Sequence, residues 1–142
     1  DSVKGDVDAT DYRLELKEGA ARFELGLPNA PGIAGLAASL AMMDQVGFDT
    51  IRRQAMAVSG YFRDGLTDLG VELAPCARSE EHRSPIIAFS VPRLAETYQY
   101  LRGHQIACSL RGGYIRTGIH AYNTTHEADR ALAVLAQQLR QA

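Results

Sequence analysis

The residues best suited to chemistry lie close together near the end of the chain. Residues 109–124, with the sequence SLRGGYIRTGIHAYNT, contain two arginines, Arg111 and Arg116, together with two tyrosines, a histidine and an asparagine. An arginine on a strand is costly to bury unless an anion or an acceptor meets it. A guanidinium also binds a carboxylate through two parallel hydrogen bonds. The segment therefore predicts a site for a negatively charged group.

Two short strands and a helix start are expected to position these residues. Gly112 and Gly113 are typical of a tight hairpin turn between strands at 106–110 and 114–118. Thr124 and Glu127 have the spacing of a capping box, which predicts a helix that begins directly after the second strand. That helix carries four apolar residues on one face: Ala128, Leu132, Leu135 and Leu139.

The preceding chain predicts further helices and strands. Hydrophobic periodicity and glycine stops indicate, in order, helices at 33–46 and 49–69, strands at 71–75 and 85–91, and a helix at 94–102. Residues 22–32 and the charged residues 76–84 are expected to be loops, and 12–17 a short strand. This order predicts an α+β fold, a small and mostly antiparallel sheet covered by helices on one face. We expect residues 1–20 to be a polar N-terminal segment and residues 21–142 a single domain.

Composition restricts the possible functions. The formal net charge of −2 gives no electrostatic reason to expect nucleic acid or a membrane surface as a partner. No apolar run approaches the roughly 20 residues that span a bilayer, and no signal-peptide pattern is visible. Cys76 and Cys108 lack the spacing of metal ligands, so no metal site is expected. These features predict a cytoplasmic protein in a reducing compartment.

Lysine is scarce. Of 15 basic residues only Lys4 and Lys17 are lysines, and both lie far along the sequence from the arginine-rich segment. Chemistry that needs an amine nucleophile would have to use one of these two residues.

Two motifs give the chain a family resemblance. The segment RFELGLPNAPGIAGL at 22–36 resembles the opening of the C-terminal part of class V aminotransferase-fold enzymes, and RGGYIRTGIHAYNT at 111–124 resembles their late signature. These are fold-type I, pyridoxal-phosphate-dependent proteins that include cysteine desulfurases, selenocysteine lyases and isopenicillin-N-epimerase-like proteins. The resemblance covers about residues 20–140 and implies that the chain is the small C-terminal domain of such an enzyme.

The resemblance implies roles for individual residues. Arg116 matches the arginine that binds the substrate α-carboxylate, and Arg111 matches a position near the mouth of the active site. A solvent-exposed hairpin arginine is an equally good interpretation of Arg111. His120 could approach a substrate, but a structural role is favoured. For Asn123, capping is favoured over catalysis, so we expect no catalytic residue in this chain.

The loop before the first long helix departs from the family pattern. Asn29 matches a region that reaches the cofactor pocket across the dimer interface in relatives. Leu27 stands where those relatives have threonine, whose hydroxyl can contact the cofactor phosphate. The sequence does not tell whether another residue replaces that contact.

A second departure concerns sulfur chemistry. Desulfurase-like relatives carry a nucleophilic cysteine on a loop after the position of Arg111, but residues 111–116 are too few for that loop and include no cysteine. Cys108 precedes them in an apolar strand, where a buried thiol is favoured. Desulfuration is thus disfavoured, and transamination, racemisation or another reaction at the α-carbon is favoured.

The resemblance also implies what lies outside these residues. A pyridoxal-phosphate enzyme needs a Schiff-base lysine, an acid near the pyridine nitrogen and a phosphate cradle. We expect these on a large domain of the parent enzyme, and we expect that enzyme to be a homodimer that acts on an amino acid. The fragment alone should bind no cofactor and be inactive. Two alternatives remain. The chain could be a free-standing α+β module with an amino-acid-binding or regulatory role, or it could be a plain interaction domain.

Overall fold

The structure is a computed structural model that describes residues 15–24, 26–75 and 83–141. By its internal contacts the chain divides into two compact units, Asp1–Gln45 and Val46–Ala142. Each unit is described by itself below. The boundary expected after residue 20 stays a prediction.

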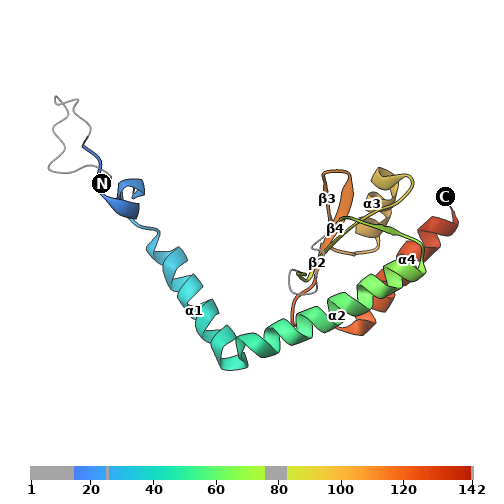
Figure 1. The fold of residues 1–142 in the computed structure, drawn as a ribbon, viewed down its shortest axis with the longest axis horizontal. Helices are drawn as coiled ribbons and strands as arrows, with labels where there is room; N and C mark the ends of the chain where they lie inside the picture. The colour runs from blue at the N-terminus through green and yellow to red at the C-terminus, as the bar shows by residue number, and fades with distance from the viewer. Residues whose placement is uncertain (1–14, 25, 76–82, 142) are drawn as a thin grey trace. The chain divides into compact units, whose positions relative to one another are not determined.

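The first unit is dominated by one long helix. A short 3₁₀ helix, η1 (Gly19–Phe23), precedes α1 (Ala30–Val46), which is drawn in cyan in Figure 1. The helix begins three residues earlier than the sequence predicted, inside the expected loop, because Asn29 caps it. Half of the strand predicted at 12–17 lies outside the described residues, and in the described half only Leu16 forms an isolated bridge.

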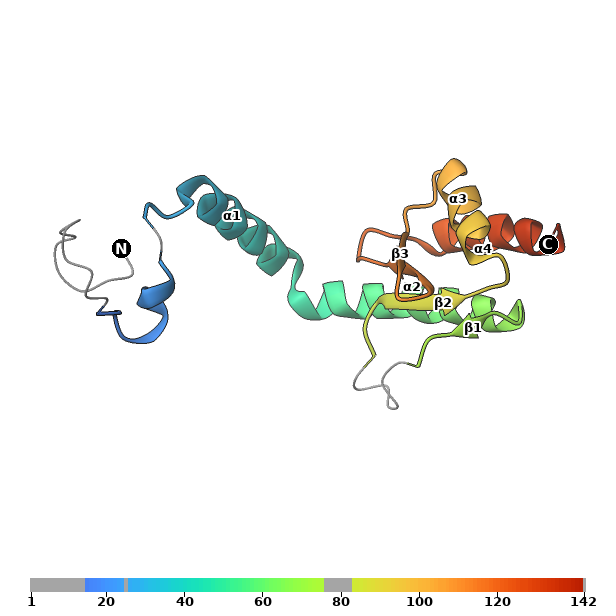
Figure 2. The ribbon, with the colours of Figure 1, turned by 90° about the horizontal axis from the view of Figure 1, so that it is seen from above.

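The second unit holds the sheet. Its elements are α2 (Phe48–Asp68), β1 (Glu72–Leu73), β2 (Ile86–Ser90), α3 (Leu94–Gly103), β3 (Ser109–Arg111), β4 (Tyr114–Gly118) and α4 (Thr125–Arg140). The strands pair antiparallel in the order β1-β2-β4-β3. Helices α2, α3 and α4 pack on one face of this sheet (Figure 2). The predicted α+β fold is confirmed.

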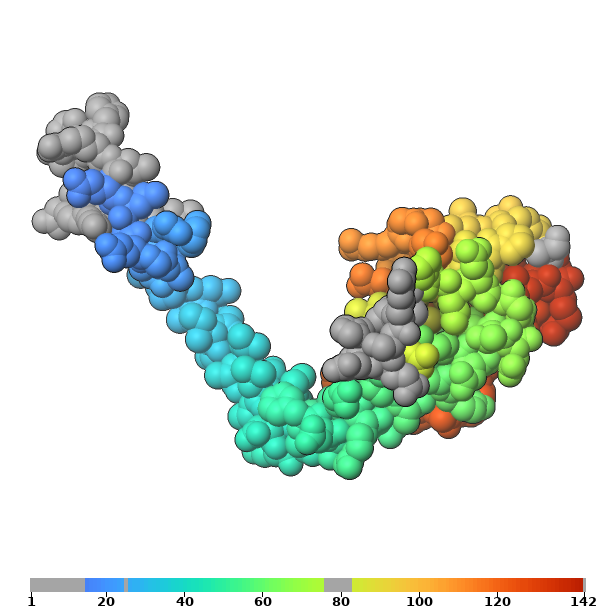
Figure 3. All heavy atoms as spheres, in the orientation of Figure 1, coloured from blue at the N-terminus to red at the C-terminus, as the bar shows by residue number. Residues whose placement is uncertain are grey.

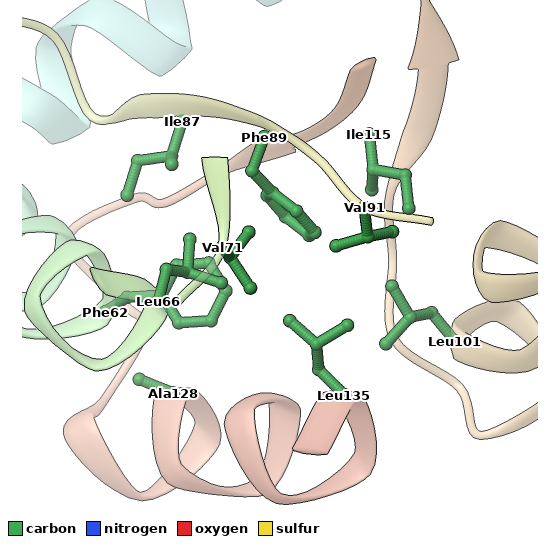
Figure 4. Close-up of a cluster of buried hydrophobic side chains, with 10 residues drawn as sticks. All are labelled: Phe62, Leu66, Val71, Ile87, Phe89, Val91, Leu101, Ile115, Ala128 and Leu135. Atoms are coloured by element: carbon green, nitrogen blue, oxygen red, sulfur yellow. The ribbon is translucent and has the colours of Figure 1, made fainter. Parts of the chain in front are cut away.

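Alternation along the strands separates a buried face from an open one. Ile87, Phe89, Ile115 and Thr117 are buried, whereas Arg116 and Gly118, which alternate with them, are exposed. The buried residues meet one face of α2, formed by Ala55, Val58, Phe62 and Leu66. Figure 4 shows Leu135 of α4 and Leu101 of α3 pointing into the same cluster. The core therefore lies between the sheet and the helices, and the opposite sheet face is left uncovered by them.

The ends of α2 and α3 share one backbone motif. At the end of α2 the amide of Val71 donates to the carbonyl of Leu66, with Gly70 between them at φ +71°. At the end of α3 the amide of Ile106 donates to Leu101 in the same way, but Gln105 takes the left-handed position at φ +61°. Both are Schellman-type ends, which favour glycine at that position.

The end of α3 explains why β3 begins later than the sequence predicted. A strand was predicted from residue 106, whereas β3 begins at Ser109. Ile106 completes the end of α3, so its amide is not available to the sheet. Strand β1 is likewise shorter than predicted. The charged loop expected at 76–84 lies mostly outside the described residues.

Helix α1 exposes apolar side chains on several sides. None of its residues is buried, and its large exposed side chains are Ile33, Leu36, Leu40, Met42 and Val46. A helix that is hydrophobic all round is normally buried in a larger core.

Within the described ranges, no helix is both long and apolar enough to cross a membrane.

Candidate functional site: two arginines on the open face of the sheet

Arg116 lies at the centre of the open sheet face. In the register of the sheet it is opposite Ala88 of β2 on one side and Ser109 of β3 on the other. Residues directly opposite each other in a sheet project to the same face, so these are its immediate neighbours. Both are small, and Gly118, two residues further along the same face, has no side chain. The guanidinium is thus accessible to a ligand.

Arg111 shares this face. It pairs with Tyr114 across the β3–β4 hairpin, whose turn uses Gly112 and Gly113 at φ +56° and +81°. The two positive φ angles are those of the tight turn that the glycine pair predicted. Because Ser109 is opposite Arg116 and Arg111 is two residues along, the two arginines are diagonal neighbours. The hairpin lies at the surface of its unit, drawn in orange in Figure 3.

Both arginine side chains are exposed. Among the described residues, neither Arg111 nor Arg116 forms a side-chain hydrogen bond or an ion pair. Other arginines of the same unit are engaged: Arg93 donates to the carbonyl of Gln141 at 2.8 Å, and Arg130 donates to that of His104 at 2.9 Å. Within the described part of the chain, the two arginines of the open face thus have donors to offer a ligand.

The turn after β4 is held by its own hydrogen bonds. The amide of His120 donates to Oδ1 of Asn123 at 2.9 Å, and the His120 ring stacks on Tyr122 with centroids 4.8 Å apart. The Nδ1 atom of His120 is buried without a partner among the described residues. The contact made by Asn123 agrees with the structural role favoured for it and fixes the end of the strand that carries Arg116. The structural role favoured for the His120 ring stays a prediction, because its Nδ1 has no partner among the described residues.

The capping box predicted at the start of α4 is present. The amide of Glu127 donates to the Thr124 hydroxyl at 3.3 Å, and the amide of Thr124 donates to the Glu127 carboxylate at 2.8 Å. These donors, the Thr124 amide first, hold the pKa of Glu127 below its ordinary value. The carboxylate is therefore committed to starting the helix.

Asn29 also works as a helix cap. Its Oδ1 accepts from the amide of Gly32 at 3.1 Å, and its carbonyl accepts from the amide of Ile33. A Cβ at position 32 would lie 2.5 Å from the Asn29 amide nitrogen, so Gly32 leaves room for the cap. Asn29 belongs to the first unit, and a cofactor-pocket role for it stays a prediction.

The residues of the sheet do not form a complete pyridoxal-phosphate site. Lys17, the one described lysine, precedes η1 in the first unit, and Lys4 lies outside the described residues. Among its described residues, the open sheet face has no lysine that could bind the aldehyde of pyridoxal phosphate and no acidic residue next to Arg111 or Arg116. No group of three metal-ligating side chains occurs within the described ranges.

Cys108 does not have the surroundings of a nucleophile. It is half-buried against the core, and burial raises the pKa of its thiol, an effect that the charge of Arg102 partly opposes. Thiolate is the reactive form, so a raised pKa makes the group less reactive at neutral pH. The structure shows no loop between Arg111 and Arg116 beyond the two-glycine turn.

A cavity of about 210 Å³ lies elsewhere in the second unit, lined by the helix-facing side of the sheet together with α2 and α4. Its polar rim includes Glu127 and Arg130, which are engaged in the cap and in the bond to His104. The small residues that surround Arg116 were not predicted from the sequence. Alternation along β4 places Gly118 on the same face as Arg116, but no residue close in sequence indicated Ala88 as its neighbour.

Comparison with known proteins identifies the family. Residues 5–131 match the family described as Aminotransferase class-V. The match covers most of the chain, and the chain belongs to this family.

The similar proteins are longer than this chain. It is 28% identical over 150 residues to a protein named "Probable cysteine desulfurase" from Pyrococcus abyssi, covering 95% of this chain and 37% of that protein. It is 32% identical over 137 residues to a cysteine desulfurase from Klebsiella pneumoniae, covering 84% and 32%. The solved apo structure of a cysteine desulfurase from Thermococcus onnurineus superposes with a TM-score of 0.81 at 25% identity, covering 99% of this chain and 38% of that one. The chain thus spans about a third of the length of these relatives.

Proposed function

We propose that this chain is the C-terminal part of a pyridoxal-phosphate-dependent enzyme that acts on an amino acid, and that Arg116 binds the substrate α-carboxylate. The observation that carries the proposal is an unpartnered guanidinium on an open sheet face, between two small neighbours, in a chain of the class V aminotransferase family. A strand fixes the direction of the side chain, and the fork of the guanidinium matches a carboxylate.

The rest of the active site would come from outside this chain. A large domain would supply the Schiff-base lysine and the phosphate cradle, and would cover part of the apolar surface of α1. The short share of each relative that the chain spans supports this arrangement. A homodimer in which Asn29 approaches the cofactor pocket of the partner is part of the same proposal, as is a cytoplasmic location.

The reaction class we favour is one at the α-carbon, such as transamination or epimerisation, in preference to desulfuration. The similar proteins named above carry the name cysteine desulfurase, so our preference against desulfuration differs from what those names suggest. Our preference rests on Cys108, whose pKa is raised by burial, and on the two-residue turn that separates β3 from β4.

Kinetics with matched substrates test the proposal. In the full-length protein that contains this chain, Arg116→Gln should lower kcat/KM for an amino acid substrate by roughly 10²–10⁴-fold, since two charge-assisted hydrogen bonds are worth about 1.5–3 kcal/mol each. The corresponding amine, which lacks the carboxylate, should react equally slowly with both proteins. Arg140→Gln, at an exposed arginine near the end of α4, is the control and should change neither rate. An Arg116→Gln enzyme that keeps its preference for the amino acid would refute the assignment.

A further inference from the structure

The second arginine of the open face bears on substrate choice. We infer that Arg111 is a subsite for a second anionic group, so that the preferred substrate is an amino acid with an acidic side chain, an amino dicarboxylate. This inference rests on the proposed function, because it takes the α-carboxylate to be bound at Arg116.

The register of the hairpin sets the spacing of the two charges. Ser109 is directly opposite Arg116, and Arg111 is directly opposite Tyr114. Diagonal neighbours on one face of an antiparallel pair have Cα atoms about 7–8 Å apart, within reach of long side chains. Two guanidinium groups at that separation match two carboxylates joined by a short carbon chain.

The charge balance of the face favours a dianion. Two like charges side by side repel each other, and a structural arginine normally obtains an acceptor, as Arg93 and Arg130 do in this unit. Neither Arg111 nor Arg116 has such an acceptor among the described residues. The nearest described acid on the same face, Glu72, is on β1 at the opposite edge of the sheet, opposite Ser90. A monocarboxylate would neutralise one of the two charges, and a dicarboxylate would neutralise both.

The surrounding side chains leave room for such a ligand. Ala88, Ser109 and Gly118 surround Arg116 with little bulk, and Ser90, opposite Tyr114 by extension of the register, turns its hydroxyl to the carbonyl of Gly113 at 3.4 Å. Tyr114, opposite Arg111 on the same face, is half-buried. The small side chains thus leave an open area next to Arg116.

Calorimetric titration of the full-length protein that contains this chain tests the inference. L-Alanine, L-aspartate and L-glutamate are compared as ligands at constant ionic strength. We expect the two dicarboxylates to half-saturate the protein at a concentration at least about fivefold below that of alanine. Arg111→Gln should remove this advantage, and Arg111→Lys should keep part of it, since lysine retains the charge without the fork.

The outcomes separate the two proposals. Equal affinity for alanine and the dicarboxylates, lowered for all three by Arg116→Gln, would overturn the second subsite and leave the carboxylate role of Arg116 standing. An Arg111→Gln protein that loses as much affinity for alanine as for the dicarboxylates would also overturn it, because the two arginines would then hold one carboxylate. An Arg116→Gln protein that binds all three ligands as tightly as the unaltered protein would contradict the proposed function itself.

Discussion

The contact between α2 and α4 gives the sharpest stability prediction, at Gly65. A Cβ built on this residue would collide with the Leu132 side chain of α4, with Cδ2 at 3.1 Å and Cγ at 3.3 Å also in close contact. Gly60 lies in the same helix, and a Cβ there would meet no atom within 4 Å. The two glycines therefore form a matched pair in which only one alanine substitution is opposed by packing.

The expected magnitudes follow from two opposing effects. Alanine is favoured over glycine inside a helix by about 0.8–1.0 kcal/mol, so Gly60→Ala should raise the free energy of unfolding by about that amount. The same gain applies to Gly65→Ala, but overpacking against Leu132 costs about 1–3 kcal/mol. Gly65→Ala should therefore be less stable than Gly60→Ala by about 1–3 kcal/mol.

Urea unfolding followed by circular dichroism measures this difference. For a unit of roughly 100 residues, each 1 kcal/mol also moves the melting temperature by about 4–8 °C, which gives a second readout. Leu132→Ala should restore part of the loss in the double variant with Gly65→Ala, because it removes the colliding atoms. If Gly65→Ala stabilises as much as Gly60→Ala, or if the two substitutions add without coupling, the packing of α2 on α4 described here is wrong.

Three further predictions concern helix ends. Gln105→Gly should stabilise the protein by about 0.5–1 kcal/mol in urea unfolding, because glycine adopts φ +61° without strain, whereas Gln105→Ala should give no such gain. Asn29→Ala should destabilise the start of α1 by about 1 kcal/mol and Asn29→Asp should not, as judged by hydrogen exchange of the first helical turns. The lowered pKa of Glu127 contributes stability above its ordinary value of 4.5, and that contribution is lost as the pH falls through the lower folded pKa. In a carboxyl titration by nuclear magnetic resonance, Thr124→Ala should bring this pKa only part of the way back, because the hydroxyl donor is lost while the backbone amide remains, and Thr124→Ser should leave the pKa low.

Local sequence signals predicted most of the second unit. The glycine pair at 112–113, the capping box at Thr124 and the apolar stripe of α2 each depend on residues close in sequence, and each is confirmed. The start of β3 was predicted wrongly because the end of α3 and the following strand compete for the same residues. Residues 106–108 are apolar enough for a strand, but the end of α3 uses the amide of Ile106.

The candidate site was only partly predictable. Successive side chains of a strand point to opposite faces of the sheet. Because Ile115 is buried, the neighbouring Arg116 lies on the open face. The neighbours of Arg116 depend on which strands pair and in which register, and the order β1-β2-β4-β3 is set by long-range packing. The diagonal relation of Arg111 to Arg116 required the hairpin register, which the two-residue turn fixes.

Substrate protection of Arg116 from phenylglyoxal tests the central proposal most directly. In the full-length protein, peptide mass spectrometry should show Arg116 modified more slowly when an amino acid substrate is present, and at an unchanged rate with the corresponding amine. Arg140, exposed on α4, should be modified at the same rate under all conditions. Modification of Arg116 that is equally fast with and without the amino acid at saturating concentration would contradict its role as the carboxylate anchor.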